Sequence, residues 1–445
     1  MKISKYLRDL SLKASFNHFP QRFLSLMQTC KLKTLKLTQK MPSGDRSRGL
    51  QVNLSKYIPS TIEDLSLFWS DRAPKVVKFQ HPFSIKHLEN LQKLELGMPI
   101  AINTFKDIIK SIQDPSKLKS LRFNLRKQNW RDSIDDIGGF LRRCASLEVM
   151  NIKSSMIDFY SETGTMRLKE LAIQQSVDED EDLLTLGDLI QQQQNSLESL
   201  SLKLVVSSRR SFGPGSWFDP LFTKVKLLKN LKRLELRLIP YVSSERLSIS
   251  ASLAQVVAAL DELEEIDLEE VSADFKSENN SLDEFCKALE QKHSKTLRSL
   301  KLLLNGCSCS EKLLQTLKRL PRLEHLTLRN FLIEKGSNFF AELRDIVCYR
   351  NRGLNSVIMR NAKIKDHKDN ENFIRMLKGI IWKPTMKNFD YREVSLFYHH
   401  SCLERVKELN LDDVLKEVHH FEYLGICSAL ELDSLKWRAL GMLGM

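Results

Sequence analysis

The side chains that could ligate a metal or act as nucleophiles in this sequence fall into two small groups. One is Cys307-Ser308-Cys309, and the other comprises His399, His400, Cys402, His419 and His420. A structural zinc site needs more widely spaced cysteines and a second ligand pair, which the first group lacks. Adjacent histidines in a strand point to opposite faces, so the second group is a poor ligand set. No phosphate-binding glycine loop, dinucleotide fingerprint, metalloprotease helix or nucleophile elbow is present. We therefore expect no catalytic residue, no metal and no cofactor.

Charge gives a clearer pattern. The chain has 445 residues and a net charge of +13, and its first 150 residues hold 27 Lys and Arg against 13 Asp and Glu. A basic excess of this kind attracts anionic partners. A second basic stretch, on the strands between Lys301 and Arg392, lacks the interleaved aromatic residues that a single-stranded nucleic-acid groove uses. We expect a protein partner with an acidic or mixed-charge segment and no specific nucleic-acid partner. Charges that only solvate the surface are the alternative.

A recurring six-residue phrase, L-x-x-L-x-L, must position these residues. Full copies begin at Leu32, Leu91, Leu197, Leu231 and Leu323, and looser ones at Leu7, Ile62, Leu118, Leu147, Leu168, Leu263, Leu297, Leu354 and Met386. Leu326 and Leu328 alternate with polar residues, which predicts a half-buried strand with His325, Thr327 and Arg329 on its open side. Apolar residues at helical spacing follow most copies. A strand and a helix every ~29 residues are the signature of leucine-rich repeats.

The expected fold class is therefore α/β: a leucine-rich-repeat solenoid, or curved horseshoe, with parallel strands on the concave face and helices on the convex face. Residues 7–395 resemble the ribonuclease-inhibitor type of leucine-rich-repeat protein. That resemblance implies Asn or Cys three residues after the last Leu of each phrase, and only Asn305 fits, so we expect irregular loops. We expect one solenoid domain of about fourteen repeats over residues 1–395 and a C-terminal capping segment over residues 396–445.

The strand register predicts which side chains face a partner on the concave side. In the ninth and tenth copies they are Arg233, Glu235, Arg237, Glu265, Asp267 and Glu269. These charges could receive a basic peptide or neutralise each other across the strands. Further along, Lys301, His325, Arg329 and Arg360 form a basic stretch that could hold an acidic segment or phosphate. Phe68, exposed on the third copy, is a candidate anchor because aromatic residues are enriched in binding hot spots.

The predicted function is a non-enzymatic scaffold or adaptor that binds a protein on its concave face. One alternative is the substrate-recognition subunit of a ubiquitin ligase, which needs an F-box-like helical segment for which there is no room before Leu7. Another is a GTPase-activating protein of the Ran-regulator type, which shares the fold, although residues 401–445 lack an acidic tail. We expect a cytoplasmic or nuclear location, because no apolar run is long enough to span a bilayer and the eight cysteines are scattered.

Overall fold

The structure of the chain is a computed structural model, and its elements fall into two compact units, residues 1–208 and 209–445. It describes residues 7–14, 21–39, 54–69, 83–125, 134–153, 166–177, 180–206, 218–240, 250–268, 281–304, 311–333, 338–364, 370–381, 383–393, 423–428 and 435–437. Several residues singled out in the sequence lie outside these ranges: Glu269, Asn305, Cys307, Cys309, His399, His400, Cys402, His419 and His420.

The first unit contains one parallel β-sheet whose strands follow each other in chain order. They are β1 (Asp9–Ala14), β2 (Thr34–Gln39), β3 (Asp64–Trp69), β4 (Lys93–Ile100), β5 (Ser120–Leu125), β6 (Val149–Lys153), β7 (Glu170–Val177) and β8 (Ser199–Val206). The register aligns the repeats: Leu35 of β2 pairs with Leu65 of β3, and Leu65 pairs with Leu94 of β4. Equivalent phrase positions therefore stack in rows across the sheet.

The second unit repeats this arrangement. Its parallel strands are β9 (Arg233–Pro240), β10 (Glu265–Leu268), β11 (Ser299–Leu303), β12 (His325–Arg329), β14 (Ser356–Ile364), β15 (Asn388–Glu393) and β16 (Tyr423–Ser428). The short β13 (Leu332–Ile333) pairs with β14, and β17 (Leu435–Trp437) runs antiparallel to β16. The parallel pairing of β16 was not anticipated, because its segment lacks the opening leucine of the phrase.

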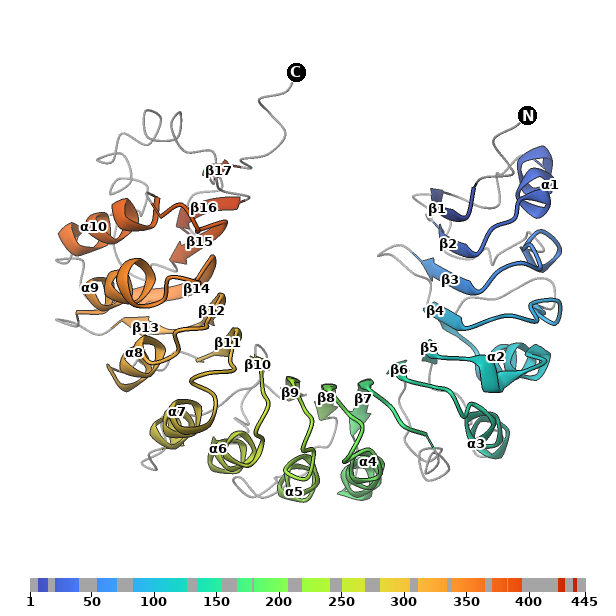
Figure 1. The fold of residues 1–445 in the computed structure, drawn as a ribbon, viewed down its shortest axis with the longest axis horizontal. Helices are drawn as coiled ribbons and strands as arrows, with labels where there is room; N and C mark the ends of the chain where they lie inside the picture. Colours follow the sequence, from blue (N-terminus) through green and yellow to red (C-terminus); the bar gives the residue numbers. More distant parts are fainter. Residues whose placement is uncertain are drawn as a thin grey trace. The chain divides into compact units, whose positions relative to one another are not determined.

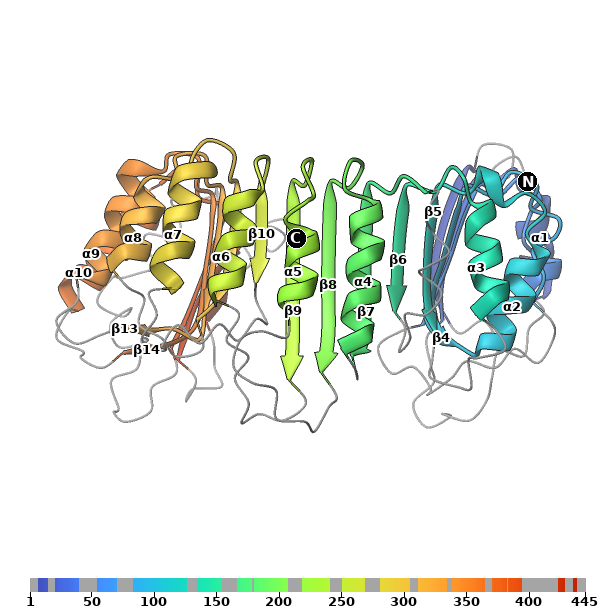
Figure 2. The same ribbon diagram turned by 90° about the horizontal axis from the view of Figure 1, so that it is seen from below.

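Helices cover one face of the sheet in each unit (Figures 1 and 2). They are α1 (Gln21–Thr29), α2 (Ile102–Ser111), α3 (Ile134–Arg143) and α4 (Asp180–Gln192) in the first unit; and α5 (Asp219–Val225), α6 (Ser250–Ala259), α7 (Ser281–Lys292), α8 (Glu311–Lys318), α9 (Phe339–Arg344) and α10 (Asn370–Ile381) in the second. Their apolar stripes are buried against the strands, as with Phe105, Ile108 and Ile109 of α2. A π-helical turn, Asp345–Arg350, continues α9.

Each of the fourteen phrase copies runs into a strand, and from the second copy on its described apolar positions form the core, whereas Leu7, Leu10 and Leu12 of the first copy are only half-buried. Leu326 and Leu328 are fully buried, as the alternation predicts. The chain therefore folds as an α/β leucine-rich-repeat solenoid, which confirms the predicted fold class. The face of each sheet turned away from the helices is called the open face below. Thr327 was expected to be exposed there and is buried, because it lies between Lys301 and Ile358 on the neighbouring strands.

The residues at the second position of the phrase, just before each strand begins, are linked from repeat to repeat by backbone hydrogen bonds. The carbonyl oxygen of Lys33 accepts hydrogen bonds from the backbone N–H groups of Glu63 and Asp64, at 2.8 and 3.0 Å. Corresponding carbonyls repeat this pattern along both sheets. Side chains at the same position form ion pairs: Lys33–Glu63, Glu148–Lys169, Glu264–Arg298 and Arg298–Glu324. Neighbouring repeats are thus joined outside their leucine core.

Candidate functional site

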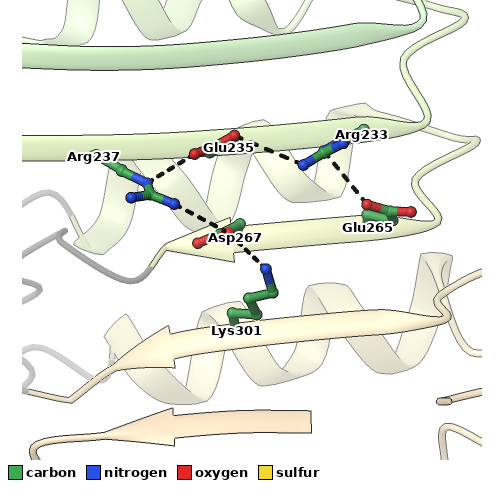
Figure 3. A network of polar contacts seen from close by, with 6 residues as sticks. All are labelled: Arg233, Glu235, Arg237, Glu265, Asp267 and Lys301. Atoms are coloured by element: carbon green, nitrogen blue, oxygen red, sulfur yellow. Dashed lines mark hydrogen bonds and ion pairs between the residues drawn. The ribbon is translucent and has the colours of Figure 1, made fainter. Parts of the chain in front are cut away.

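Six charged side chains on the open face of the second unit form one connected network on β9, β10 and β11 (Figure 3). Ion pairs join Arg233 to Glu265 at 3.4 Å and to Glu235 at 3.9 Å, and join Arg237 to Glu235 at 2.8 Å. Asp267 lies 3.9 Å from Arg237 and 3.1 Å from Lys301. All six residues were predicted from the strand register to share this face, and the structure places them together.

This network balances its own charge. Three cations face three carboxylates, and every carboxylate contacts at least one cation. Its two ends differ in exposure: the side chains of Arg233 and Glu265 are half exposed, whereas that of Asp267 is 7% exposed. A buried carboxylate needs its partners, because an unpaired charge removed from water is costly. The alternative of mutual neutralisation therefore describes the observed contacts.

The basic stretch beyond this network is also partly neutralised. Lys301 belongs to the network, and Arg360 of β14 donates to Asp390 of β15 from Nε at 2.8 Å. Asp390 was not identified from the sequence. His325 is exposed and Arg329 is half-buried on β12. The stretch is thus less cationic than its sequence indicates.

Phe68 lies on the open face of the first unit near the end of β3, where it is half-buried rather than exposed as the sequence predicted. Two cations approach its ring: the Nζ atom of Lys36 on β2 lies 5.1 Å from the ring centroid, and the Cζ atom of Arg122 on β5 lies 5.7 Å from it. The ring also lies against Gly97 of β4, where a Cβ atom would be 2.3 Å from Cδ1 of Phe68. This site combines an apolar surface with positive charge. Phe68 and the basic network residues lie in different units, so each forms a site of its own.

Carboxylates next to Phe68 are held by their own partners. Glu95 of β4 accepts a hydrogen bond from Ser66 Oγ at 2.7 Å and pairs with Lys93 at 3.3 Å. The pKa of Asp64 is raised, first by burial and then by the nearby carboxylates of Glu63 and Glu95, while Lys93 opposes the shift. On this part of the open face, the cations Lys36 and Arg122 lie at the ring of Phe68, and the carboxylate of Glu95 already has partners.

Sequence reasoning found Phe68 and missed Lys36, Arg122 and Gly97. The signal was available in the repeat register. Lys36, Ser66, Glu95 and Arg122 occupy one row of paired positions across β2 to β5. A glycine at an open-face position one strand from a phenylalanine indicates room for the ring. Reading rows across copies, as well as along each copy, would have found the cluster.

The described residues show little chemistry of the catalytic kind. Within them, no group of three or more His, Cys, Asp or Glu side chains could hold a metal ion. Cys30, Cys144, Cys286 and Cys348 are free. Burial raises the pKa of Cys144 to about 12 and that of Cys286 to about 11, so both thiols stay protonated at neutral pH. In the part of the chain that the structure covers, every helix is too short or too polar to cross a membrane.

No protein-family model and no curated protein matches the chain. Among solved structures, it is similar to the leucine-rich-repeat ectodomain of the Arabidopsis receptor kinase HAESA, which was solved in complex with an N-terminally extended IDA peptide hormone. The match covers 86% of this chain and 69% of that one, with 13% sequence identity and a TM-score of 0.28. The assignment to leucine-rich-repeat solenoids rests on the repeat phrase and on the strands and helices described above.

Proposed function

We propose that the protein is a non-enzymatic scaffold or adaptor, of the ribonuclease-inhibitor-like kind, that binds a protein partner on the open faces of its sheets. The observation that carries the proposal is Phe68, a half-buried aromatic side chain on an open strand face with two cations beside it. Helices bury the other face of each sheet, so the open face is where strand side chains remain accessible. Aromatic and arginine side chains are the residue types most enriched in binding hot spots.

Charge supports a partner with an acidic or mixed-charge segment. Complementary charge speeds encounter and selects partners more than it adds affinity. The second unit offers a separate polar surface on its own open face, where the charges of six residues already satisfy one another: Arg233, Glu235, Arg237, Glu265, Asp267 and Lys301. The exposed His325 and the half-buried Arg329 and Arg360 extend that polar surface.

We place the protein in the cytoplasm, with the nucleus as the alternative, because the free thiols favour a reducing compartment. Residues 1–395 form the solenoid in this proposal, and residues 396–445 cap it. The capping role is supported by β17, which turns back antiparallel on β16 after a run of parallel strands. No contact among the described residues favours a ubiquitin-ligase subunit or a GTPase-activating protein.

The proposal can be tested by site-specific photo-crosslinking in native extract. A crosslinking side chain is placed at Thr38 or Asn124 on the open face, and in matched variants at Lys110 or Arg143 on the helices. We expect distinct protein adducts from the open-face positions and few from the helical ones. Adducts mainly from the helical positions, or to nucleic acid alone, would contradict the proposal.

A further inference from the structure

We propose that the open face of the first unit binds an extended acidic peptide segment laid across β2 to β5, with Phe68 as its apolar anchor and Lys36 and Arg122 as its carboxylate-binding cations. This inference rests on the proposed function and deepens it by naming the surface and the chemistry of the partner. It departs from the expectation that the charged strands of the ninth and tenth copies carry the binding.

The backbone of β4 leaves room for the aromatic ring. Phe68 lies so close over Gly97 that any larger residue there would collide with the ring. The strand pairing of β4 with β5 shifts between Leu96 and Pro99, directly around Gly97. The ring therefore lies over the middle of the four strands, rather than standing isolated on β3. A side chain of a bound segment can pack against its exposed surface.

The two cations beside the ring differ from those of the second unit. Lys36 and Arg122 are exposed, and both contact the ring. Among the described residues, neither lies within ion-pair distance of a carboxylate, whereas each of Arg233, Arg237 and Lys301 does. A partner carboxylate can approach Lys36 and Arg122 without displacing an existing ion pair. The apolar ring on one side also lowers the local dielectric, which strengthens the attraction.

Further cations lie at both ends of this surface. Lys13 of β1 and Lys153 of β6 are exposed at the same open-face position that Phe68 occupies on β3. The row that they share also contains the half-buried Thr38 and Asn124, which can hydrogen-bond to a peptide backbone. Electrostatic steering toward the ring would thus come from both directions along a segment that crosses the strands.

Strand spacing sets the pattern that the segment must carry. Neighbouring strands lie about 4.8 Å apart, so β2 and β5, three spacings apart, are separated by roughly 14 Å. Residues four apart in an extended chain are separated by about 13 Å and point to the same side, and so does the residue midway between them. The charged groups of Lys36 and Arg122 lie 5.1 and 5.7 Å from the ring centroid, nearer to each other than their strands are, so partner carboxylates reach them from the outer sides. The segment should therefore read acidic–x–apolar–x–acidic, with the apolar side chain over the ring of Phe68.

A peptide fits this surface better than a nucleic acid. Glu95 of β4 lies in the same row of paired strand positions as Lys36 and Arg122. Asp64 lies on β3, the strand between β2 and β4. A phosphate backbone carries charge at every step and would be repelled by these carboxylates, while two separated peptide carboxylates can avoid them. A single aromatic ring also offers only one stacking position, whereas single-stranded nucleic acids use successive ones.

The test uses the full chain and labelled synthetic peptides. In each peptide a leucine lies between two glutamates, whose separation is varied from two to six residues, and binding is followed by fluorescence anisotropy. A single-stranded oligonucleotide of equal length is measured in parallel. We expect the tightest binding at a separation of four. Lys36→Gln combined with Arg122→Gln should weaken it roughly 2- to 30-fold, the range for two exposed ion pairs.

The control is Lys31→Gln combined with Lys86→Gln, which removes the same charge from exposed positions outside the open face. Phe68→Leu keeps apolar bulk and removes the aromatic ring, and it should abolish the preference for a midway leucine over glycine. Equal losses in the control, no dependence on separation, or tighter oligonucleotide binding sensitive to Lys36 and Arg122 would overturn the inference. Open-face crosslinks to a protein without acidic-peptide binding would overturn this inference and leave the proposed function standing.

Discussion

The guanidinium group of Arg360 holds the carboxylate of Asp390 with two contacts to the same oxygen. Nε donates to Oδ2 at 2.8 Å, and Nη2 lies 2.7 Å from it. The side chain of Asp390 is 1% exposed, although it belongs to the open face of β15. Arg360, on the adjacent β14 and one third exposed, covers it. One side chain of the expected basic surface therefore serves as the partner of a buried charge.

Removing this cation should destabilise the fold. Arg360→Met removes both contacts of the guanidinium group with the buried carboxylate of Asp390, and we expect a loss of about 2–4 kcal/mol in the free energy of unfolding. The double variant Arg360→Met/Asp390→Leu should recover most of that loss, because no charge is left unpaired. Arg352→Met, at an exposed position, is the control. Denaturant titrations of the four proteins check this, and a double variant as unstable as Arg360→Met would contradict it.

The core register makes a second prediction. Leu326→Ala removes a fully buried side chain and should cost about 2–5 kcal/mol through the cavity that it leaves. His325→Ala, one residue earlier on the exposed side of the same strand, should change stability by less than about 0.5 kcal/mol. Equal shifts in the denaturation midpoint would show that the register of β12 is wrong.

The repeat phrase was sufficient to predict the strands, and its period-two alternation was sufficient to predict which face is buried. The phrase could not predict how deeply the open face is covered. Thr327 and Asp390 point away from the helices and are nevertheless buried, because long side chains on neighbouring strands lie over them. How far a side chain on a neighbouring strand reaches depends on its length and rotamer, and a period along one strand contains neither.

A buried histidine makes stability depend on pH. His293, which follows α7, is fully buried and its Nε2 lies 2.8 Å from the carbonyl oxygen of Val257. Burial lowers the pKa of His293 below its usual value, while the hydrogen bond to Val257 opposes the shift. The unfolded state therefore binds more protons in the window from the ordinary histidine pKa, about 6.5, down to the lowered one. Stability is fully present above this window and is lost as the pH falls through it.

We expect His293→Gln to reduce that pH dependence, whatever its effect on stability at neutral pH. The side-chain amide of glutamine has an N–H that can donate to the carbonyl. In an earlier repeat Gln193 holds the corresponding place, four residues before the phrase, where its Oε1 accepts from the backbone N–H of Leu168 at 2.9 Å. His325→Gln, which removes an exposed histidine, should keep the wild-type dependence. The measurement is the free energy of unfolding at several pH values between about 5 and 7.5. Identical slopes in wild type and His293→Gln would contradict the prediction.

Lys383 follows α10 and donates hydrogen bonds to the backbone of the preceding repeat. Its Nζ donates to the carbonyl oxygens of Val347, Asn351 and Leu354, at 2.6, 2.9 and 2.8 Å. Lys383→Met would remove this donor from one carbonyl in the π-helical turn and two in the segment that follows it, at a cost of about 2–3 kcal/mol. Lys378→Met, on the exposed side of α10, should be nearly neutral. We also expect faster amide exchange over Asp345–Arg350 in Lys383→Met but not in Lys378→Met. Unchanged exchange in Lys383→Met would contradict the proposed stabilising role of Lys383.

The strand register predicted which face of the sheet carries these residues. It could not predict which of their charges are paired with each other and which are available to a partner. Arg233 and Glu235 were predicted to share a surface, which follows from spacing alone. Whether a cation there is free depends on the strand beside it, and that strand begins about thirty residues further along the chain. The cluster around Phe68 was missed for the same reason, since Lys36 and Arg122 lie on different repeats.

The last prediction separates stability from binding in the network of the second unit. Asp267→Lys would place a third cation against Arg237 and Lys301 in a nearly buried position, and we expect it to cost more than about 3 kcal/mol. Glu265→Lys faces only the half-exposed Arg233 and should cost less than about 1 kcal/mol. Lost partner capture by Asp267→Lys would therefore report unfolding, whereas lost capture by a stable Glu265→Lys would show that this network contacts the partner. Paired denaturation and capture measurements distinguish the two, and equal stability of both variants would contradict the burial assigned to Asp267.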